Sequence, residues 1–341
     1  MPDVRLDNVS FAYAGSSELV LRSIDLTIPE GEFVLLAGPS GCGKSTLALV
    51  VVGLIPSRIA GHLRGGVYLG ERNVSAMGIH EASQHIGMVF QNPEEQLIHL
   101  DVEAEVAFGP ENLALPRSEI EQRVEKSLTY TGVEQLRKQE IFALSGGQKQ
   151  RVAISATLAM LPKVLVLDEP TSDLDPVGTH EVLNTLHLLN KQYGMTILLI
   201  EHKIDEIVPW VDRVLLMEEG KVVVDAPPRK AFDDIQNWQE LGVSVPQMVQ
   251  LARALPDIFQ GSIPLSVDEA YEALHGTVYA QALLHRNEVQ RKKNIRGPTA
   301  NSTSSGDSVA AQSLLSWESV GLAYGARQVL KDINVKVMPE E

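Results

Sequence analysis

The sequence predicts an α/β domain built around a largely parallel sheet, and three observations carry this prediction. Short apolar runs of strand length alternate with helix-length segments, as expected where helices connect parallel strands. A glycine-rich loop stands directly between one apolar run and one helical segment. Cys42 is the only cysteine, so an internal disulfide cannot replace a packed core.

Composition bounds the class of protein. The 341 residues suggest about two domains at roughly 150 residues each. The chain is 44% hydrophobic and 21% charged, an ordinary globular balance. Its net charge of −15 argues against a protein that mainly grips nucleic acid. The apolar runs are shorter than the roughly 20 residues of a membrane span.

The first part of the chain reads as strands followed by a helix. In order, we expect a strand from Val4, a turn at 15–17, a strand over Leu19–Ile28, a turn at 29–31, a buried strand over Phe33–Ala37 and a helix over Ser45–Leu54. Pro56 is expected to end that helix.

The middle of the chain continues the alternation. In order, we expect a strand-rich insert over 57–82, a strand over Ile86–Phe90, helices within 100–142, a helix over Val152–Leu161, a strand over Val164–Leu167, a helix over Glu181–Tyr193 and a strand over Thr196–Ile200.

The composition changes after residue 225. Short helices are predicted at Met248–Leu255 and Val267–Leu274, and the segment Arg286–Arg296 is basic. Gly297–Ser313 is small and polar, which is typical of a flexible linker.

An internal repeat joins the two ends of the sequence. The segment from Leu6 to Tyr13 matches Trp317–Tyr324, and Val20–Ile28 matches Val329–Val337 if the second copy has a turn two residues shorter. We therefore expect 314–341 to be the truncated start of a second copy of the first domain.

The glycine-rich loop carries a phosphate-binding motif. Gly38–Ser45 (GPSGCGKS) fits G-x-x-x-x-G-K-[ST] in full, between a predicted strand and helix. Backbone N–H groups would surround phosphates, Lys44 would reach the outer phosphates and Ser45 would ligate Mg²⁺. Cys42 is most simply a small residue in this tight loop, although the nearby helix N-terminus could lower its pKa.

A second candidate site consists of two adjacent carboxylates. Asp168 and Glu169 follow the apolar run 164–167. Beside a phosphate loop, Asp168 could hold Mg²⁺ and Glu169 could polarise a water molecule.

A third element is the segment Leu144–Gln148 (LSGGQ), before a predicted helix. Ser145 can cap that helix, and the glycines expose backbone N–H groups to an anion. One nucleotide does not need two such loops, unless a second subunit supplies one of them.

Together these segments resemble the ATP-binding-cassette (ABC) ATPases. The phosphate loop matches Walker A, Leu144–Gln148 matches the signature, and Val164–Glu169 matches Walker B. In the same order, Tyr13 matches the aromatic that stacks on adenine, Gln91 the Q-loop glutamine, Ser172–Asp175 the D-loop and His202 the switch histidine. Asp173 departs from the alanine that is more usual in the D-loop.

The resemblance implies a P-loop NTPase domain of ABC type, with an antiparallel β edge, a helical subdomain and a small C-terminal extension. It implies ATP and Mg²⁺ as cofactors. The implied catalytic residues are Lys44, Gln91, Glu169 and His202. The implied metal ligands are Ser45, Gln91 and Asp168. The implied nucleotide-binding residues are Tyr13, Gly38, Pro39, Ser40, Gly41, Cys42, Gly43, Lys44, Ser45, Thr46, Ser145, Gly146, Gly147, Gln148 and Asp175.

Two further segments, Val89–Leu97 and Glu105–Leu113, resemble the energy-coupling-factor ATPases, which power uptake of vitamins and of nickel or cobalt ions. This implies an ATP-hydrolysing importer subunit at the cytoplasmic face of the membrane. The implied partners are a second ABC domain (in the same full-length chain or by self-pairing), a transmembrane scaffold docked near Gln91 and a separate membrane substrate-binding subunit, with no nucleic acid. The alternative is a soluble tandem-cassette ATPase acting on the ribosome.

The expected domain boundaries follow from these matches. They are 4–225 for the ABC domain, about 92–157 for its helical subdomain, 226–290 for the extension, 291–313 for the linker and 314–341 for the second cassette.

Overall fold

The computed structural model describes residues 3–259, 261–275, 315–324 and 327–337. The chain divides into two compact units, residues 1–283 and 284–341, which are described separately. The expected linker, 291–313, and the basic segment 286–296 lie outside the described residues.

The first unit contains two sheets. The antiparallel sheet has the strand order β2 (Leu21–Ile28), β1 (Val4–Tyr13), β4 (Gly61–Leu69) and β5 (Arg72–Asn73). The central sheet has the order β10 (Lys221–Ala226), β9 (Arg213–Glu218), β3 (Phe33–Ala37), β8 (Thr196–Ile200), β7 (Val164–Asp168) and β6 (Ile86–Val89). Its neighbours from β9 to β6 pair in parallel. The predicted fold class is therefore confirmed.

Helices cover both faces of the central sheet. Within residues 4–225 the helices are α1 (Lys44–Val51), α2 (Leu54–Ser57), α3 (Val74–Met77), α4 (Ile79–Ala82), α5 (Pro93–Gln96), α6 (Val102–Asn112), α7 (Arg117–Thr131), α8 (Gly146–Leu158), α9 (Pro176–Tyr193) and α10 (Ile204–Ile207), with 3₁₀ turns at Glu134–Leu136 and Ile141–Ala143. Among the described residues, every helix is too short or too polar to cross a bilayer.

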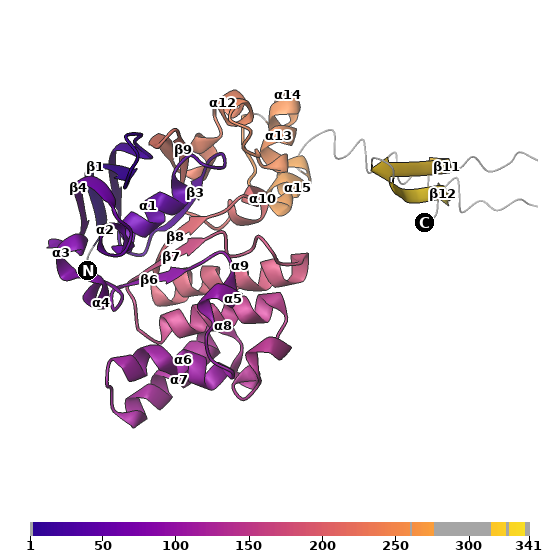
Figure 1. The fold of residues 1–341 in the computed structure, drawn as a ribbon. Helices are drawn as coiled ribbons and strands as arrows, with labels where there is room; N and C mark the ends of the chain where they lie inside the picture. The colour runs from indigo at the N-terminus through magenta and orange to yellow at the C-terminus, as the bar shows by residue number, and fades with distance from the viewer. Residues whose placement is uncertain (1–2, 260, 276–314, 325–326, 338–341) are drawn as a thin grey trace, which may run out of the picture. The chain divides into compact units, whose positions relative to one another are not determined.

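Helix α1 lies between the two sheets (Figure 1). Its apolar side chains, such as Leu47 and Val51, share one buried cluster with residues of β1 and β3. A second cluster on the other face of the central sheet contains residues of α8 and α9. Strands β3 and β8 are buried at every position, which explains their uninterrupted apolar sequences.

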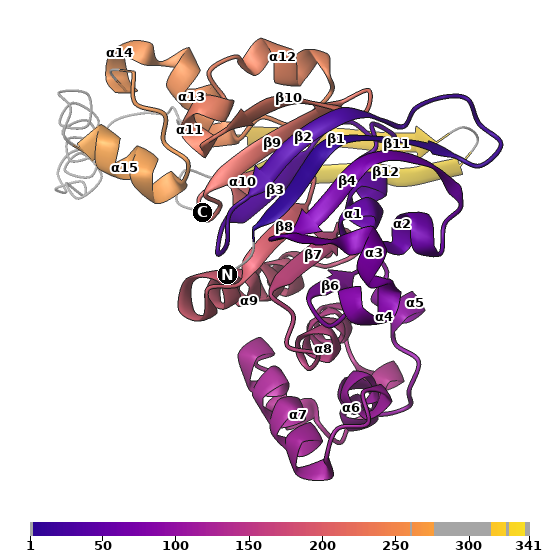
Figure 2. The same cartoon turned by 90° about the vertical axis from the view of Figure 1, so that its left-hand side faces the viewer.

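Helices α6 and α7 form a region of their own with part of α8 (Figures 1 and 2). Its core includes Val106, Val124, Leu128 and Val152. Both views place α6 and α7 at the far end of the first unit from β1. This arrangement matches the expected helical subdomain.

Three predicted helix boundaries were wrong, for local reasons. Helix α1 ends at Val51, before Pro56, because Gly53 adopts a left-handed conformation with φ of 76°. Helix α8 begins at Gly146, where Ser145 caps it, and α9 begins at Pro176, where Asp175 caps it. Caps of Ser and Asp outweigh the polar character of these first turns.

The C-terminal extension packs on the central sheet. Its helices are α11 (Pro228–Ala231), α12 (Ile235–Glu240), α13 (Gln247–Ala254), α14 (Pro256–Phe259) and α15 (Val267–His275). Trp238 is fully buried and belongs to the cluster that covers the central sheet. Its indole Nε1 donates to the carbonyl of Ala231 at 2.9 Å. The extension therefore shares a core with the central sheet.

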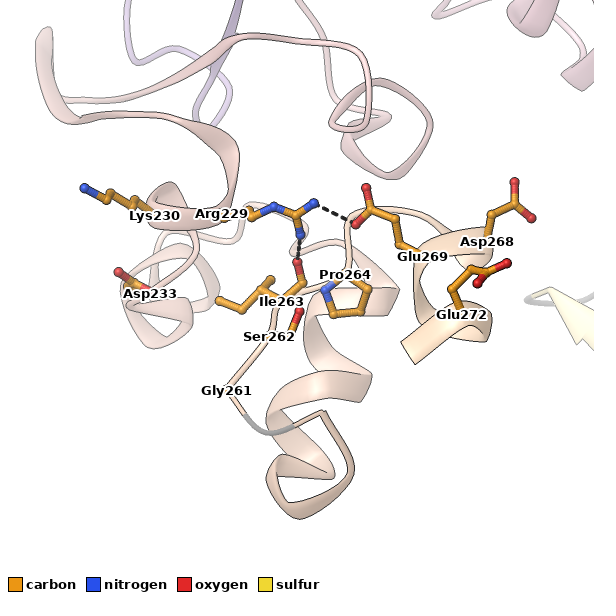
Figure 3. Close-up of a pocket in the computed structure, with 10 residues that line it drawn as sticks. All are labelled: Arg229, Lys230, Asp233, Gly261, Ser262, Ile263, Pro264, Asp268, Glu269 and Glu272. Atoms are coloured by element: carbon orange, nitrogen blue, oxygen red, sulfur yellow. Dashed lines mark hydrogen bonds and ion pairs between the residues drawn. The ribbon is translucent and has the colours of Figure 1, made fainter. Parts of the chain in front are cut away.

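A polar hollow lies within this extension (Figure 3). Arg229 donates from Nη2 to Glu269 Oε2 at 2.9 Å and from Nη1 to the carbonyl of Ile263, which fastens α11 to α15 and the loop before it. These contacts engage both terminal nitrogens of the guanidinium within the extension, so we interpret the hollow as a joint between helices.

The second unit contains an antiparallel hairpin of β11 (Leu315–Tyr324) and β12 (Arg327–Val337). It repeats the register of β1 and β2: Val9 pairs with Ile24 and Phe11 with Leu21, while Val320 pairs with Ile333 and Leu322 with Leu330. Both hairpins have register shifts just before and just after the first of these pairs. The repeat in the sequence is thus also a repeat in strand pairing.

Candidate functional site

The phosphate loop connects the carboxyl end of β3 to α1. Gly38 and Gly43 have φ of 152° and 109°. A Cβ atom at Gly43 would lie 2.9 Å from the carbonyl oxygen of Val20. No side chain caps α1, so its first N–H groups remain available to an anion.

Lys44 is buried at the start of α1. Its Nζ donates to the carbonyls of Gly38 and Pro39 at 2.8 and 2.9 Å. The ammonium is thus held against the loop where a phosphate would sit, which fits the predicted role.

Cys42 differs from one expectation. Burial raises the pKa of its thiol, and the positive charge of Lys44 opposes this shift only in part. The expectation that the helix N-terminus lowers this pKa was wrong, because desolvation of the thiolate outweighs it.

Asp168 ends β7 beside the phosphate loop. Burial raises the pKa of its carboxyl, and a hydrogen bond with Ser45 opposes that shift. Its Oδ1 is buried and has no hydrogen-bond partner in the structure. A buried carboxylate oxygen without a partner, next to a hydroxyl, suits Mg²⁺, which binds few protein oxygens and completes its shell with phosphates and water. The described residues contain no group of three His, Cys, Asp or Glu that could hold a metal by themselves.

Glu169 and His202 face each other across the ends of β7 and β8. Nε2 of His202 lies 2.9 Å from Oε1 of Glu169. Glu169 has φ of 46°, which is unusual for a residue other than glycine. The structure therefore brings Glu169, predicted to polarise water, into contact with His202, the residue that matches the switch histidine.

Gln91 lies on the surface after β6. It lines a hollow of about 310 Å³ with residues of α5, α8 and the segment after Glu169, including Lys149 and Asp173. In the described part of the chain no hydrogen bond joins Gln91 to Ser45 or Asp168, so its role as a metal ligand stays a prediction.

Tyr13 reaches toward the phosphate loop from β1. Its hydroxyl and Thr46 Oγ1 are 2.9 Å apart. Its ring packs edge-on against Phe11, with centroids 4.9 Å apart. The ring is partly exposed, and stacking on adenine stays a prediction.

The signature begins α8 with a capping box. Ser145 Oγ accepts from the N–H of Gln148, and Gln148 Oε1 accepts from the N–H of Ser145. The side-chain oxygen of Gln148 is therefore engaged in a hydrogen bond that caps α8. Gly147 packs against α9, because a Cβ there would lie 3.0 Å from Cα of Gly178.

The signature and the phosphate loop line different hollows. Residues 145–147 line one of about 310 Å³ with the D-loop residues 173–175. Pro39–Cys42 line one of about 620 Å³ with residues of β2 and the β9–β10 turn. The two share no lining residue. Asp175, predicted to bind nucleotide, caps α9 through a 2.7 Å bond to the N–H of Gly178.

Sequence reasoning missed three residues behind the catalytic pair. Glu201 is buried, and its carboxylate bonds to Thr171 and to the backbone N–H of His202. Lys203 contacts the same segment from the other side of His202. A charged residue directly after the apolar run 196–200 was the available signal.

The chain is similar in sequence to known ATP-binding proteins. A family model described as ABC transporter matches residues 21–172. A putative ABC transporter ATP-binding protein of Methanosarcina mazei is 39% identical over 98% of this chain and 56% of its own length. The energy-coupling factor transporter ATP-binding protein EcfA1 of Caldanaerobacter subterraneus is 42% identical over 74% of this chain and 90% of its own. The putative HMP/thiamine import ATP-binding protein YkoD of Bacillus subtilis is 35% identical over 96% of this chain and 56% of its own.

Solved structures agree with these relatives. CbiO1 of Clostridium perfringens, described as part of the ABC transporter complex cbiONQ, aligns with a TM-score of 0.63 at 34% identity, covering 73% of this chain and 98% of its own. A dimeric post-hydrolysis state of the ATP-binding cassette MJ0796, bound to ADP and Pi, aligns with a TM-score of 0.57 at 29% identity, covering 66% and 98%. This chain spans about half the length of several curated relatives, between 42% and 56% for those from Methanosarcina mazei and Methanosarcina acetivorans. With its phosphate loop, its signature and its Glu169–His202 pair in an ABC ATPase fold, the chain belongs to the family of ABC transporter ATP-binding proteins.

Proposed function

We propose that the protein is the ATP-hydrolysing component of an energy-coupling-factor type importer. The observation that carries the proposal is the meeting of the phosphate loop, Asp168 and the Glu169–His202 pair at the carboxyl ends of β3, β7 and β8. Ligands of open α/β sheets bind at this edge. Similarity to EcfA1 and CbiO1 supports the importer class.

Each residue has a task in ATP hydrolysis. The free N–H groups of α1 and the ammonium of Lys44 hold phosphate oxygens. Ser45 and Asp168 would hold Mg²⁺, which supplies charge neutralisation on the phosphates. Glu169 accepts a hydrogen bond from the attacking water and polarises it, while His202 fixes the orientation of the carboxylate.

A complete site requires two cassettes in this proposal. The phosphate loop and the signature of one chain line separate hollows. Because the two loops open into separate hollows, we infer that the loops acting on one nucleotide come from different cassettes. The dimeric neighbour MJ0796 supports such pairing.

We propose that residues 314–341 are the first strands of a second cassette. The hairpin β11–β12 repeats both the pairs and the register shifts of β1–β2. The greater length of the relatives from Methanosarcina and of YkoD is consistent with two cassettes in one chain. Self-pairing of two chains is the other source of the second cassette.

The transmembrane scaffold would dock on the helical subdomain near Gln91. Large apolar side chains are exposed there: Ile98, Leu100 and Phe142 have exposed fractions of 64%, 78% and 72%. The N–H of Ile141 donates to the carbonyl of Leu100 at 2.8 Å, so these segments adjoin. Docking would place the protein at the cytoplasmic face of the membrane.

The transported solute would be a vitamin or a transition-metal ion, bound by a separate membrane subunit. The test is reconstitution in proteoliposomes with a transmembrane scaffold and a substrate-binding membrane protein of this importer class. We expect ATP-dependent uptake that is lost in Glu169→Gln. Leu100→Asp should lower uptake while ATP binding stays at the parent level. Tight, salt-sensitive binding to ribosomes without uptake would instead support the ribosomal alternative.

A further inference from the structure

The strongest unassigned feature is a buried carboxylate directly behind the catalytic pair. Glu201 has only 2% of its surface exposed. Its Oε1 accepts from the backbone N–H of Thr171 at 3.0 Å and from the Thr171 hydroxyl. Its Oε2 accepts from the backbone N–H of His202 at 2.9 Å and more weakly from that of Lys203 at 3.4 Å. Every contact on this carboxylate is therefore a donor.

Lys203 links the same parts of the chain as a donor, whereas Glu201 links them as an acceptor. Its Nζ donates to the carbonyl of Thr171 at 2.8 Å, to Thr179 Oγ1 at 2.9 Å and to the carbonyl of Leu174 at 3.5 Å. These acceptors belong to the segment after Glu169, to α9 and to the D-loop. The two side chains thus cross between the end of β8 and the chain that follows β7.

The positions of Glu169 and His202 depend on these two segments. The backbone N–H of Glu169 donates to the carbonyl of Ile200 at 2.9 Å. Glu201 directly follows Ile200, and its carboxylate bonds to Thr171, two residues beyond Glu169. Together these bonds hold both sides of the 2.9 Å contact between Glu169 and His202. Leu174, whose backbone carbonyl accepts a hydrogen bond from Lys203, lines the hollow that contains the signature glycines.

We propose that Glu201 and Lys203 are positioning residues for hydrolysis, a pair we name the switch clamp. The clamp holds His202 in reach of Glu169 and joins this pair rigidly to the D-loop, on the side that faces the signature. It touches neither nucleotide nor water in this assignment, so its effect is on turnover and not on ATP affinity. The inference rests on the proposed function, because it needs ATP hydrolysis by this chain.

The sharpest test replaces the carboxylate by its amide. Glu201→Gln keeps the shape but turns one acceptor oxygen into an NH₂ group, which must face N–H donors in either orientation. Misplacement of catalytic groups by about 1 Å costs up to 10²-fold, so we expect kcat to fall by about tenfold or more while the KM for ATP changes by less than about threefold. Glu201→Asp retains two acceptors and should recover part of kcat. Lys203→Met, which keeps the length without the charge, should resemble Glu201→Gln.

The matched control is Asn190→Ala. Asn190 is also buried, and its amide donates to the carbonyls of Gly31 and Met195, next to the amino ends of β3 and β8. Its loss should lower the unfolding temperature but leave kcat of the folded protein unchanged. All assays use the full chain with its partner cassette, well below the unfolding temperature of each variant.

The outcomes separate the inference from the function. Parental kcat in both Glu201→Gln and Lys203→Met would overturn the clamp, and so would an equal loss of kcat in Asn190→Ala. A loss confined to ATP affinity would also overturn it. Failure of the proposed function would appear differently, as parent protein that does not hydrolyse ATP or as Glu169→Gln with unchanged turnover.

Discussion

At the scale of single residues, the backbone of Glu169 is held in a costly conformation. A φ of 46° costs a residue other than glycine of the order of 1 kcal/mol or more. The bonds of Glu169 to Ile200 and His202 stabilise this conformation. In this backbone conformation the carboxylate of Glu169 lies beside His202, which follows the end of β8.

The charge of Glu169 is the first property to test. Glu169→Gln keeps the shape but cannot polarise water as a carboxylate does, so we predict retained ATP binding and a loss of turnover of about 10²-fold or more. The measurements are ATP affinity and ATPase rate in the assembled complex. Glu121→Gln, which removes only an exposed ion pair with Arg117 on α7, should behave like the parent. Parental turnover in Glu169→Gln would show that another group activates water.

The thiol of Cys42 gives a second prediction at this scale. Because burial raises its pKa, less thiolate is present at pH 7 than for an ordinary cysteine. Maleimide should therefore react slowly at pH 7 and faster as the pH rises toward the elevated pKa. The adduct should abolish ATP binding, and Mg-ATP should protect.

Cys42→Ser supplies the control, since it removes the only cysteine and should make ATP binding insensitive to maleimide. Full ATP binding by quantitatively modified protein would contradict the placement of Cys42 in the nucleotide site.

At the scale of elements, the contact between α8 and α9 depends on paired glycines. Gly147 and Gly178 bring the first turns of the two helices together, with a Cβ at Gly147 only 3.0 Å from Cα of Gly178. A backbone atom cannot move aside as a side chain can. The signature and the D-loop lie at the first turns of these two helices. The packing of α8 against α9 therefore also determines where these two segments lie.

Gly147→Ala should therefore separate these helices. We predict a loss of about 1–3 kcal/mol in the free energy of unfolding, the usual cost of overpacking, measured by urea denaturation. Gly146→Ala is the matched variant, because its Cβ would meet only Cδ2 of Leu174 at 3.2 Å, and that side chain can shift. Equal stability of the two variants would contradict this account.

At the scale of the whole molecule, the proposed function gives one cassette two half-sites. The hollows at the phosphate loop and at the signature share no residue. Turnover should then depend on a second cassette, whichever chain supplies it.

Complementation of inactive chains tests this dependence. Lys44→Ala should lose ATP binding, and Ser145→Arg should lose the signature's contact with a partner nucleotide while keeping its own phosphate loop. Each variant alone should be inactive. A mixture should recover turnover, because the intact phosphate loop of one chain pairs with the intact signature of the other. No recovery, with pairing shown by sedimentation, would indicate that the site is complete in one cassette.

The sequence by itself determined the family and the fold class, and it predicted most residues of the candidate site. Strands β3, β7 and β8 are buried on both faces, so their apolar runs were unambiguous. The phosphate loop could be recognised because its glycines and Lys44 perform local tasks at fixed spacing. The contact between Glu169 and His202 was not predicted, because the two residues are 33 positions apart and the resemblance implied only that both are catalytic.

Only the tertiary structure decided the features that depend on distant backbone. The pKa of the Cys42 thiol is raised because the thiol is buried, and local sequence does not encode this burial. The hairpin β9–β10 was not predicted, and β9 belongs to the sheet because it pairs with β3, about 180 residues away in the chain. Glu201 looked like an ordinary charge after a strand. It became a buried acceptor because folding brings the N–H groups of Thr171 and His202 to opposite oxygens of one carboxylate.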